Sequence, residues 1–332
     1  MGKVDTNLYT YLSDKSRFAD LFNGGLFGGR QIIDPKDLTS IPGRYIQSGQ
    51  LTGENCNPQN FGSDRSRDLI MQYKSQAVLR LLAVENQTEV DYTMPWRCMN
   101  YDAREYEKQI RQLGLENRRL KKLERDAEFL CGLKKGDRLI PVYTLCVYYG
   151  EEIWDGPRSL KDMMDFGQTP LELDRWFCDY SMNLICVNEW QGEEIFCTSL
   201  RQIFAVLPHR KNKKKLREVM ERDPAYRQLD GETYRVLAVL LGEKGLAAQS
   251  EKKERKEWDM CKALEDIRLE GFEEGMERGI ERGIERGREL GVDQGKLIVV
   301  RNMLRRGMKP EDIMALAECS RALVESVQGD VI

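Results

Sequence analysis

The chain is poor in histidine: His209 is the only one among its 332 residues. A zinc site built from several histidines is therefore excluded. A Ser-His-Asp triad could use only His209. His209 follows Pro208 in a polar stretch, which favours a solvated loop residue. Nothing in the spacing of the cysteines supports a Cys-His pair.

Long apolar runs are missing as well. No uninterrupted run approaches the roughly 18 residues that a membrane helix needs, so we expect no membrane span. The N-terminus has no basic region followed by an apolar segment, which argues against secretion and favours a cytoplasmic protein. The start MGKVDT matches the spacing of a myristoylation signal, but one acyl chain holds a membrane only marginally.

Pairs of the C-x-x-C type are absent too, although nine cysteines are spread from Cys56 to Cys319. In a chain without a secretory signal this distribution predicts free thiols rather than disulfides. Cys146, Cys186 and Cys197 lie in apolar runs. A free cysteine in such a run behaves as a small buried hydrophobe.

Hydrophobic residues, at 41%, suffice for a sizeable core, and the length exceeds a usual single domain. Residues 1–205 alternate strand and helix signals, including the strand signals LIPVYTLCVYY and MNLICV, and form the candidate catalytic domain. Residues 206–250 are expected to be helical and to pack beside this core. The clearest helices there are expected at 213–221 and 233–241.

Two apolar runs rich in Val, Leu and Tyr, residues 69–73 and 77–84, flank the polar tripeptide Lys74-Ser75-Gln76. This pattern predicts a β-hairpin. A loop of about four residues is an ordinary hairpin length, and it would bring Asp68 roughly opposite Glu85. Two carboxylates then converge at the end of the hairpin.

Side chains alternate between the two faces of the second strand. Glu85 and Gln87 therefore share one face, while Asn86 points to the other. Leu82 and Val84 point away from the Glu85 face and anchor the strand in a core. We expect the acidic face to be left free for chemistry.

Paired carboxylates without a Cys or His partner suit a hard cation that prefers oxygen ligands. Mg²⁺ bound by one or two carboxylates keeps several waters, and one of these can become a nucleophile. Gln87 can position such a water through its amide but cannot take up its proton. Taken alone, the spacing D-x(16)-E-x-Q favours a half-buried strand that carries a surface Asp and Glu.

The neighbouring segments add a resemblance. Asp68 precedes a strand that ends in Glu-x-Gln, here Glu85-Asn86-Gln87. A segment of the type Met-Pro-hydrophobic-Arg, here Met94-Pro95-Trp96-Arg97, then opens a helix that carries Tyr101. Upstream, Asp14-Lys15, Phe18 and LFNGGLF fit a first helix; downstream, PVYTLCVYYG and IWDGPRSL fit the next strand and loop. From residue 9 to about 330 the chain resembles the family of recombination-promoting nucleases and transposase-like proteins, a branch of the PD-(D/E)XK nuclease superfamily.

The resemblance implies a restriction-endonuclease-like fold, with a mixed central sheet flanked by helices. It implies a DNA endonuclease that depends on Mg²⁺ or another divalent cation such as Mn²⁺ and acts in recombination or transposition. Asp68 and Glu85 would bind the metal together with the carbonyl of Asn86. Gln87 stands where the superfamily usually has Lys, which leaves the proton acceptor open.

Accessory roles are open for several further residues. Lys74 and Arg97 are the nearest candidates for a stabilising charge, but Lys74 is equally a solvated turn residue and Arg97 a phosphate contact at a helix start. Asp14 supplies either an outer-sphere carboxylate or the N-cap of a helix that begins at Lys15. Tyr101 lies on the helix that follows the site.

Local charge is uneven although the formal net charge is only −3. Residues 104–125 contain eight Lys or Arg against four Glu, and the segment PHRKNKKKLR contains six basic residues and no acid. Such clusters can contact phosphates, and solvated helix faces are the alternative. The candidates for DNA contacts are Lys74, Arg210, Lys211, Lys213, Lys214 and Lys215.

Glycine recurs every four residues in repeats such as ERGIERGIERG, which form a glycine row: Gly271, Gly275, Gly279, Gly283, Gly287, Gly291 and Gly295. On a helix these residues form an inclined row along which another backbone could approach. Each Gly costs about 1 kcal/mol relative to Ala in a helix interior, so such a helix needs a partner. Residues 251–296 are therefore either a helix that joins a homo-oligomer or a charged spacer.

Residues 297–332 return to amphipathic periodicity and predict a small helical unit. Gly307 can close a first helix, Pro310 can open a second and Ser320 can cap a third. The proportions resemble a helix-turn-helix. A plain helical hairpin is favoured, because the last helix has few base-reading side chains besides Arg321.

The sequence thus predicts an α/β protein with an all-helical C-terminal extension. Its expected activity is Mg²⁺-dependent cleavage of DNA, with DNA as its partner and no membrane. The alternative is a nuclease-fold protein that binds DNA or assembles partners without cutting.

Overall fold

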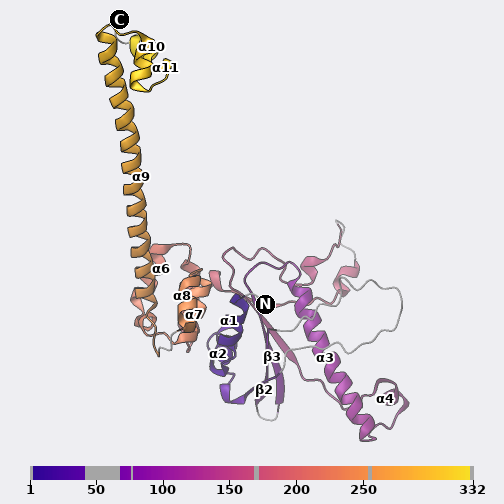
Figure 1. The fold of residues 1–332 in the computed structure, drawn as a ribbon. Coiled ribbons are helices and arrows are strands. Elements are labelled where there is room, and N and C mark those ends of the chain that lie inside the picture. Colours follow the sequence, from indigo (N-terminus) through magenta and orange to yellow (C-terminus); the bar gives the residue numbers. More distant parts are fainter. Residues whose placement is uncertain (1–2, 42–67, 76–77, 168–171, 253–255, 330–332) are drawn as a thin grey trace. The chain divides into compact units, whose positions relative to one another are not determined.

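The computed structural model describes residues 3–41, 68–75, 78–167, 172–252 and 256–329. Contacts divide the chain into two compact units, Met1–Cys261 and Lys262–Ile332, each with its own hydrophobic core. The first unit holds a mixed sheet flanked by helices, and the second is helical (Figure 1), so the predicted α/β class with a helical C-terminal part is confirmed. No helix among the described residues is long and apolar enough to cross a membrane.

Within the described residues, the first unit is built on a five-stranded sheet of order β1-β2-β3-β4-β5. The first three strands are antiparallel neighbours, whereas β3, β4 and β5 run parallel. The strands are β1 (Leu38–Ser40), β2 (Leu69–Ser75), β3 (Val78–Gln87), β4 (Val142–Tyr148) and β5 (Asn183–Cys186). β4 and β5 lie within the two predicted strand signals.

The predicted hairpin is confirmed, with a shorter loop than expected. β2 and β3 pair from Leu69 opposite Val84 to Ser75 opposite Val78. Lys74 and Ser75 are therefore strand residues, and the prediction of a polar loop at Lys74-Ser75-Gln76 is wrong at these two positions. The backbone ladder continues past the apolar run, because an edge of a two-stranded ribbon accepts polar side chains that point to solvent.

One face of the sheet is covered by α1 (Lys3–Leu12) and α2 (Lys15–Phe27). α2 approaches the central strands closely at Gly25, where an added Cβ would collide with Ile185 of β5 and touch Leu145 of β4. A side chain at this position would force the end of Ile185 to move. The motif LFNGGLF is thus a helix–sheet contact.

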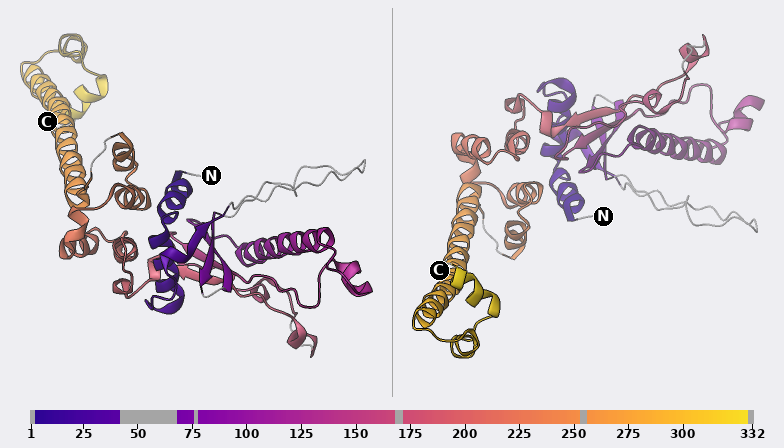
Figure 2. Two further views of the ribbon diagram at one scale, coloured as in Figure 1. Left: turned by 90° about the horizontal axis from the view of Figure 1, so that it is seen from below. Right: turned by 90° about the horizontal axis from the view of Figure 1, so that it is seen from above.

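The other face is covered by α3 (Met94–Arg119). Its first turns pack through Met94 and Cys98 on Cys146 of β4. Figure 2 shows that α3 then extends beyond the sheet and carries α4 (Asp126–Cys131) near its far end.

The segment 206–250 is helical and belongs to the same unit as the sheet, as predicted. Its helices and the one before it are α5 (Leu200–Val206), α6 (Lys213–Arg222), α7 (Gly231–Leu240) and α8 (Lys244–Lys252). α6 and α7 match the two predicted helices, and α7 packs against α1 and α8.

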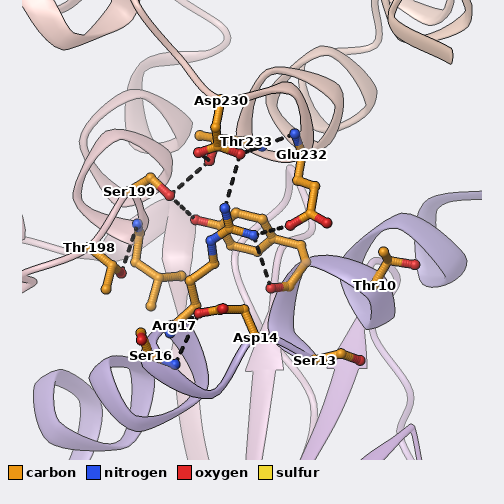
Figure 3. A network of polar contacts seen from close by, with 12 residues as sticks. Thr10, Ser13, Asp14, Ser16, Arg17, Thr198, Ser199, Asp230, Glu232 and Thr233 are labelled. Carbon is orange, nitrogen blue, oxygen red and sulfur yellow. Dashed lines mark hydrogen bonds and ion pairs between the residues drawn. The ribbon is translucent and has the colours of Figure 1, made fainter. Parts of the chain in front are cut away.

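A network of polar contacts ties this segment to the N-terminal helices (Figure 3). Arg17 of α2, whose side chain is 14% exposed, donates to Asp230 at 2.9 Å and also to Glu232. Asp230 is the N-cap of α7 and accepts hydrogen bonds from the backbone N–H groups of Glu232 and Thr233. One carboxylate therefore both starts a helix and holds it to α2.

Tyr11 of α1 completes the network. Its hydroxyl shares a hydrogen bond of 2.9 Å with that of Ser199, which also accepts one of 2.8 Å from Thr233. The guanidinium of Arg17 lies 4.3 Å from the centre of the Tyr11 ring. Burial raises the pKa of Tyr11, so its hydroxyl stays protonated in this position.

The described cysteines are all free, as predicted. Cys146 and Cys186 are buried, but Cys197 is exposed, so the prediction for this third residue is wrong. Cys197 lies in the turn before α5, where its backbone N–H donates to the buried carboxylate of Asp20. The backbone of this turn faces inward, and the thiol faces solvent.

The second unit consists of most of α9 (Met260–Arg305) with α10 (Pro310–Ala317) and α11 (Arg321–Gly329). Its core is the cluster of Val300, Ile313, Val324 and Val327. Residues 297–329 are largely helical, as expected, but α9 continues across the predicted boundary at 296/297, and the compact unit begins at Lys262.

The predicted ends of these helices are confirmed as well. Gly307 follows α9 with a φ of 74°, which glycine adopts without strain. Pro310 is the first residue of α10. The Ser320 hydroxyl accepts a hydrogen bond from the N–H of Leu323, at 3.4 Å, at the start of α11.

The glycine row lies on α9, so this part of residues 251–296 is helical. A Cβ built on any of the seven glycines meets no described atom within 4 Å. The apolar residues that follow five of them in sequence are exposed too: Phe272, Met276, Ile280, Ile284 and Val292. Self-association through this row stays a prediction.

Candidate active site

Asp68 and Glu85 come together at the end of the hairpin, as predicted. The last pair of the ladder is Leu69 opposite Val84, so the next step along both strands sets Asp68 opposite Glu85. Opposed residues of antiparallel strands have Cβ atoms about 4.5–5.5 Å apart. Asp68 Oδ2 also accepts a hydrogen bond of 2.8 Å from the backbone N–H of Asn86, which fixes this carboxylate beside β3.

The backbone carbonyl of Asn86 faces the same corner. The N–H and C=O of one residue leave a strand on the same side, and the side alternates from residue to residue. The carbonyl of Gln87 accepts from the N–H of Tyr149 at 2.7 Å, on the β4 side. The carbonyl of Asn86 therefore leaves on the side of Asp68, and we define the two carboxylates and this carbonyl as the carboxylate corner.

Glu85 is buried, with only 1% of its surface exposed. The prediction that the acidic face is free is wrong, because α3 packs on this face through Met94 and Cys98. The neighbour of Glu85 on β4 is Cys146. Burial, with the nearby thiol of Cys98 and the carboxyl of Glu85, raises the pKa of Cys146, so this thiol is neutral.

Arg97 brings a positive charge close to the carboxylate corner. Its Nη1 donates to Oδ2 of Asp91 at 2.6 Å, and its charge acts on Cys146, the neighbour of Glu85 in the sheet. Burial lowers the pKa of Arg97, but the hydrogen bonds to Asp91 and Tyr101 outweigh this effect and leave it raised. The guanidinium is therefore permanently charged.

Asp102 fixes α3 to the sheet, and Tyr101 of the same helix lies beside Arg97. The Arg97 guanidinium lies 6.0 Å from the centre of the buried Tyr101 ring. Asp102 accepts hydrogen bonds of 2.6 Å from the hydroxyls of Thr144 on β4 and of Tyr180. Short hydrogen bonds to a buried carboxylate are strong, so Asp102 holds α3 over the corner.

Two of the accessory candidates, Lys74 and Asp14, lie away from the carboxylate corner. Lys74 is exposed near the hairpin loop, six residues beyond Asp68 along β2, which is about 20 Å at the usual rise of a strand. It is too far away to stabilise charge at the carboxylate corner. Asp14 is the N-cap of α2 and accepts from the N–H groups of Ser16 and Arg17, both at 3.0 Å, so its N-cap interpretation is confirmed.

Gln87 ends β3 beside Tyr148 of β4. The segments that follow these two strands line a cavity of about 590 Å³. Its charged lining residues are Glu89, Glu151, Glu152, Asp155 and Arg210. Four acids and one base make this cavity unfavourable for phosphate groups.

The predicted basic segment has two kinds of position. Arg210 donates to the backbone carbonyl of Gly150, and Lys211 forms an ion pair of 2.6 Å with Glu152. Lys213–Lys215 form the first turn of α6 and are exposed. Cations at a helix N-terminus interact unfavourably with the helix dipole, so these lysines do not stabilise α6.

The described residues contain no group of three His, Cys, Asp or Glu side chains that could hold a metal ion. Mg²⁺ is commonly bound through one or two carboxylates and keeps several waters. The carboxylate corner offers oxygen donors of this kind, so its residues fit such a cation.

Comparisons of the chain with protein-family models, with curated proteins and with solved structures gave no match.

Asp91 is the residue of this site that the sequence analysis missed. Besides Arg97, it accepts hydrogen bonds from the N–H and the hydroxyl of Thr93, at 2.8 and 2.6 Å. An Asp two residues before a Thr and shortly before the helix-opening Met94-Pro95 is typical of a turn that starts a helix. That signal indicates the turn, but the ion pair with Arg97 depends on how the turn folds back.

Proposed function

We propose that this chain is a Mg²⁺-dependent DNA endonuclease with a restriction-endonuclease-like fold, acting in recombination or transposition. The observation that carries the proposal is the carboxylate corner, in which Asp68 and Glu85 lie opposite each other beside the backbone of Asn86. A mixed sheet with helices on both faces is compatible with this fold. The resemblance of the surrounding segments supports the class of reaction.

Asp68, Glu85 and the carbonyl of Asn86 are the groups that would hold the cation. When bound, Mg²⁺ polarises a phosphodiester oxygen and lowers the pKa of a bound water. Such a cation would lie beside Glu85, whose side chain is only 1% exposed.

The chain's own side chains have distinct roles in this proposal. Gln87 points to the same face as Glu85 and orients a water through its amide, which cannot accept the proton. Arg97 keeps its charge at every ordinary pH and stabilises negative charge on the reacting phosphate. Asp91 holds Arg97 in place as its ion-pair partner.

Nicking of supercoiled plasmid DNA by the purified protein tests the proposal. Wild type should nick in Mg²⁺ and not in EDTA. Asp68→Ala and Glu85→Ala should abolish nicking, whereas Gln87→Ala should keep part of the rate, because an orienting amide matters less than a ligand. Nicking by repurified Glu85→Ala at the wild-type rate would remove this site from the reaction.

A nuclease-fold protein that binds DNA or assembles partners without cutting is the second candidate function. It is favoured by the burial of Glu85 beneath α3 and by a Gln at position 87 in place of a lysine. In this case the wild type would bind DNA but not nick it in Mg²⁺ or Mn²⁺. Binding and nicking measured on one preparation separate the two functions.

A further inference from the structure

The far part of α3, helix α4 and the loop back to β4 project from the sheet (Figure 2). We define the distal arm as residues 110–139. At its base the amide of Gln109 donates to the backbone of Ile140 at 3.1 Å and accepts from it at 2.7 Å. Every residue of the arm is described, and Leu123 is its only buried hydrophobic side chain.

Polar contacts hold the distal arm together in place of a core. The side chain of Asn117 donates to the carbonyl of Gly132 at 3.1 Å and to Asp137 at 2.7 Å. Glu128 accepts hydrogen bonds from three backbone N–H groups, including that of Lys135. Two of the arm's acids are thus used internally.

The distal arm has an excess of positive charge. It contains nine Lys or Arg against five Asp or Glu. Two of the cations are paired with acids, Arg111 with Glu107 and Lys122 with Glu116. All but one are exposed: Arg111, Arg118, Arg119, Lys121, Lys122, Arg125, Lys135 and Arg138. This surface complements a polyanion.

An apolar element lies among these cations. Phe129 and Leu130 of α4 are 58% and 89% exposed. Phe129 also lines a hollow of about 430 Å³, together with Asn117, Arg118, Lys121 and Leu123. An aromatic ring beside two cations is the combination that binds a base by stacking and its phosphates by charge.

We propose that the distal arm docks single-stranded DNA, with an unpaired base against Phe129 and the neighbouring phosphates on Arg118 and Lys121. Bases stack on aromatic rings whatever their identity, and only an unpaired base has a free face. The inference deepens the proposed function and rests on it for the nucleic-acid substrate. A bilayer is less suited, because α4 has six residues and no continuous apolar face.

Fluorescence anisotropy with labelled oligonucleotides tests the base subsite. The full chain in EDTA, where no cutting is expected, is titrated into single strands and into duplex of the same sequence. Wild type should bind the single strand more tightly. Phe129→Ala should weaken single-strand binding about tenfold, as expected for one lost stacking contact, with little change for duplex, and Phe129→Tyr should restore it. Phe129 is exposed, so these variants should fold.

Salt titrations test the phosphate contacts. Replacing Arg118, Lys121 and Lys135 by Gln should flatten the slope of log affinity against log salt by about two for single strands. The matched control replaces three exposed cations outside the arm: Lys15, Arg30 and Lys36. The control should leave the slope nearly unchanged. Equal flattening in both triple variants would mean that only net charge matters, and would overturn the proposal.

Two further outcomes would also overturn it. One is wild-type affinity of Phe129→Ala for single strands. The other is binding of the wild type to phosphatidylglycerol vesicles, lost in Phe129→Ala, together with unchanged DNA affinity. The nicking assay separates this inference from the proposed function. If Phe129→Ala nicks normally and binds DNA like the wild type, the nuclease function stands and the base subsite is wrong. If single-strand binding depends on Phe129 but the wild type does not nick, the subsite stands and the nuclease function is wrong.

Discussion

Replacing Asp68 by Asn tests whether the carboxylate corner binds a cation, independently of any cutting. Asn keeps an oxygen that can accept the hydrogen bond from the N–H of Asn86 but loses the charge. The fold should therefore survive and the cation site should not. Since a ligand of the folded state stabilises that state by linkage, Mg²⁺ should raise the Tm of the wild type and hardly change that of Asp68→Asn.

The size of the effect follows from the linkage relation and the length of the first unit. At about ten times its Kd, Mg²⁺ contributes about 1.4 kcal/mol, and at about a hundred times about 2.7 kcal/mol. A domain of this size shifts by about 2–4 °C per kcal/mol. The wild-type Tm should therefore rise by about 3–11 °C. Tryptophan fluorescence is a suitable signal, because the tryptophans of the chain all lie within Met1–Cys261.

Asp34→Asn is the matched control. Asp34 is an exposed N-cap that accepts a hydrogen bond of 2.9 Å from the N–H of Lys36, so this variant also exchanges one carboxylate for an amide in a capping position. It should keep the wild-type shift in Mg²⁺, at ionic strength held constant with NaCl. Equal shifts for Asp68→Asn and the wild type would refute the reasoning and place the cation elsewhere.

Three further predictions concern other parts of the chain. Arg17→Met should destabilise the first unit by about 1–2 kcal/mol in urea melts at pH 7, because a charged hydrogen bond is lost but its acceptors are half-exposed. Burial raises the pKa of Asp230, but hydrogen bonds from Thr233 and the charge of Arg17 outweigh it and leave the pKa lowered. The stabilisation of the folded state by ionised Asp230 is therefore present above about pH 4 and disappears as the pH falls further. The free energies of unfolding of wild type and Arg17→Met should converge at that low pH. Exchanging Lys213–Lys215 for Gln should flatten the salt dependence of duplex binding by up to about 2.7 without weakening α6, and an unchanged slope would make the segment ordinary surface. Ala at three positions of the glycine row should raise helicity in circular dichroism, by about 1 kcal/mol of helix stability each, since the added Cβ atoms meet nothing; a smaller mass in light scattering would assign the row to self-association, and an unchanged mass would make it a spacer.

The hairpin could be predicted from sequence because its determinants are local. The alternation of β3 and a short connection suffice to set Asp68 opposite Glu85. A shorter loop does not by itself change which residues are paired, because extra pairs simply form next to the loop. The observed strands keep the predicted register, so Asp68 still lies opposite Glu85. The loop error does matter for Lys74, which belongs to the strand and lies far from the carboxylate corner.

The burial of Glu85 could not be predicted in this way. It depends on α3 folding back so that Met94 and Cys98 reach Cys146 of β4. Periodicity within one strand shows which side chains share a face, but not which element covers that face. For the same reason the ion pair of Asp91 with Arg97 escaped the sequence analysis, although both residues flank a recognisable helix start.

The surroundings of the two ends of β4 differ in charge, and under the proposed function this would limit how DNA approaches. The acidic cavity lies beyond Tyr148, after the last residue of the strand. The base of the distal arm lies before the first residue, where Gln109 bonds to Ile140. The acids of the cavity repel phosphates, whereas the cations of the distal arm attract them. A strand bound on the arm would therefore run along α3 toward Arg97 and Glu85, with the cavity beyond Gln87 left to groups other than phosphate.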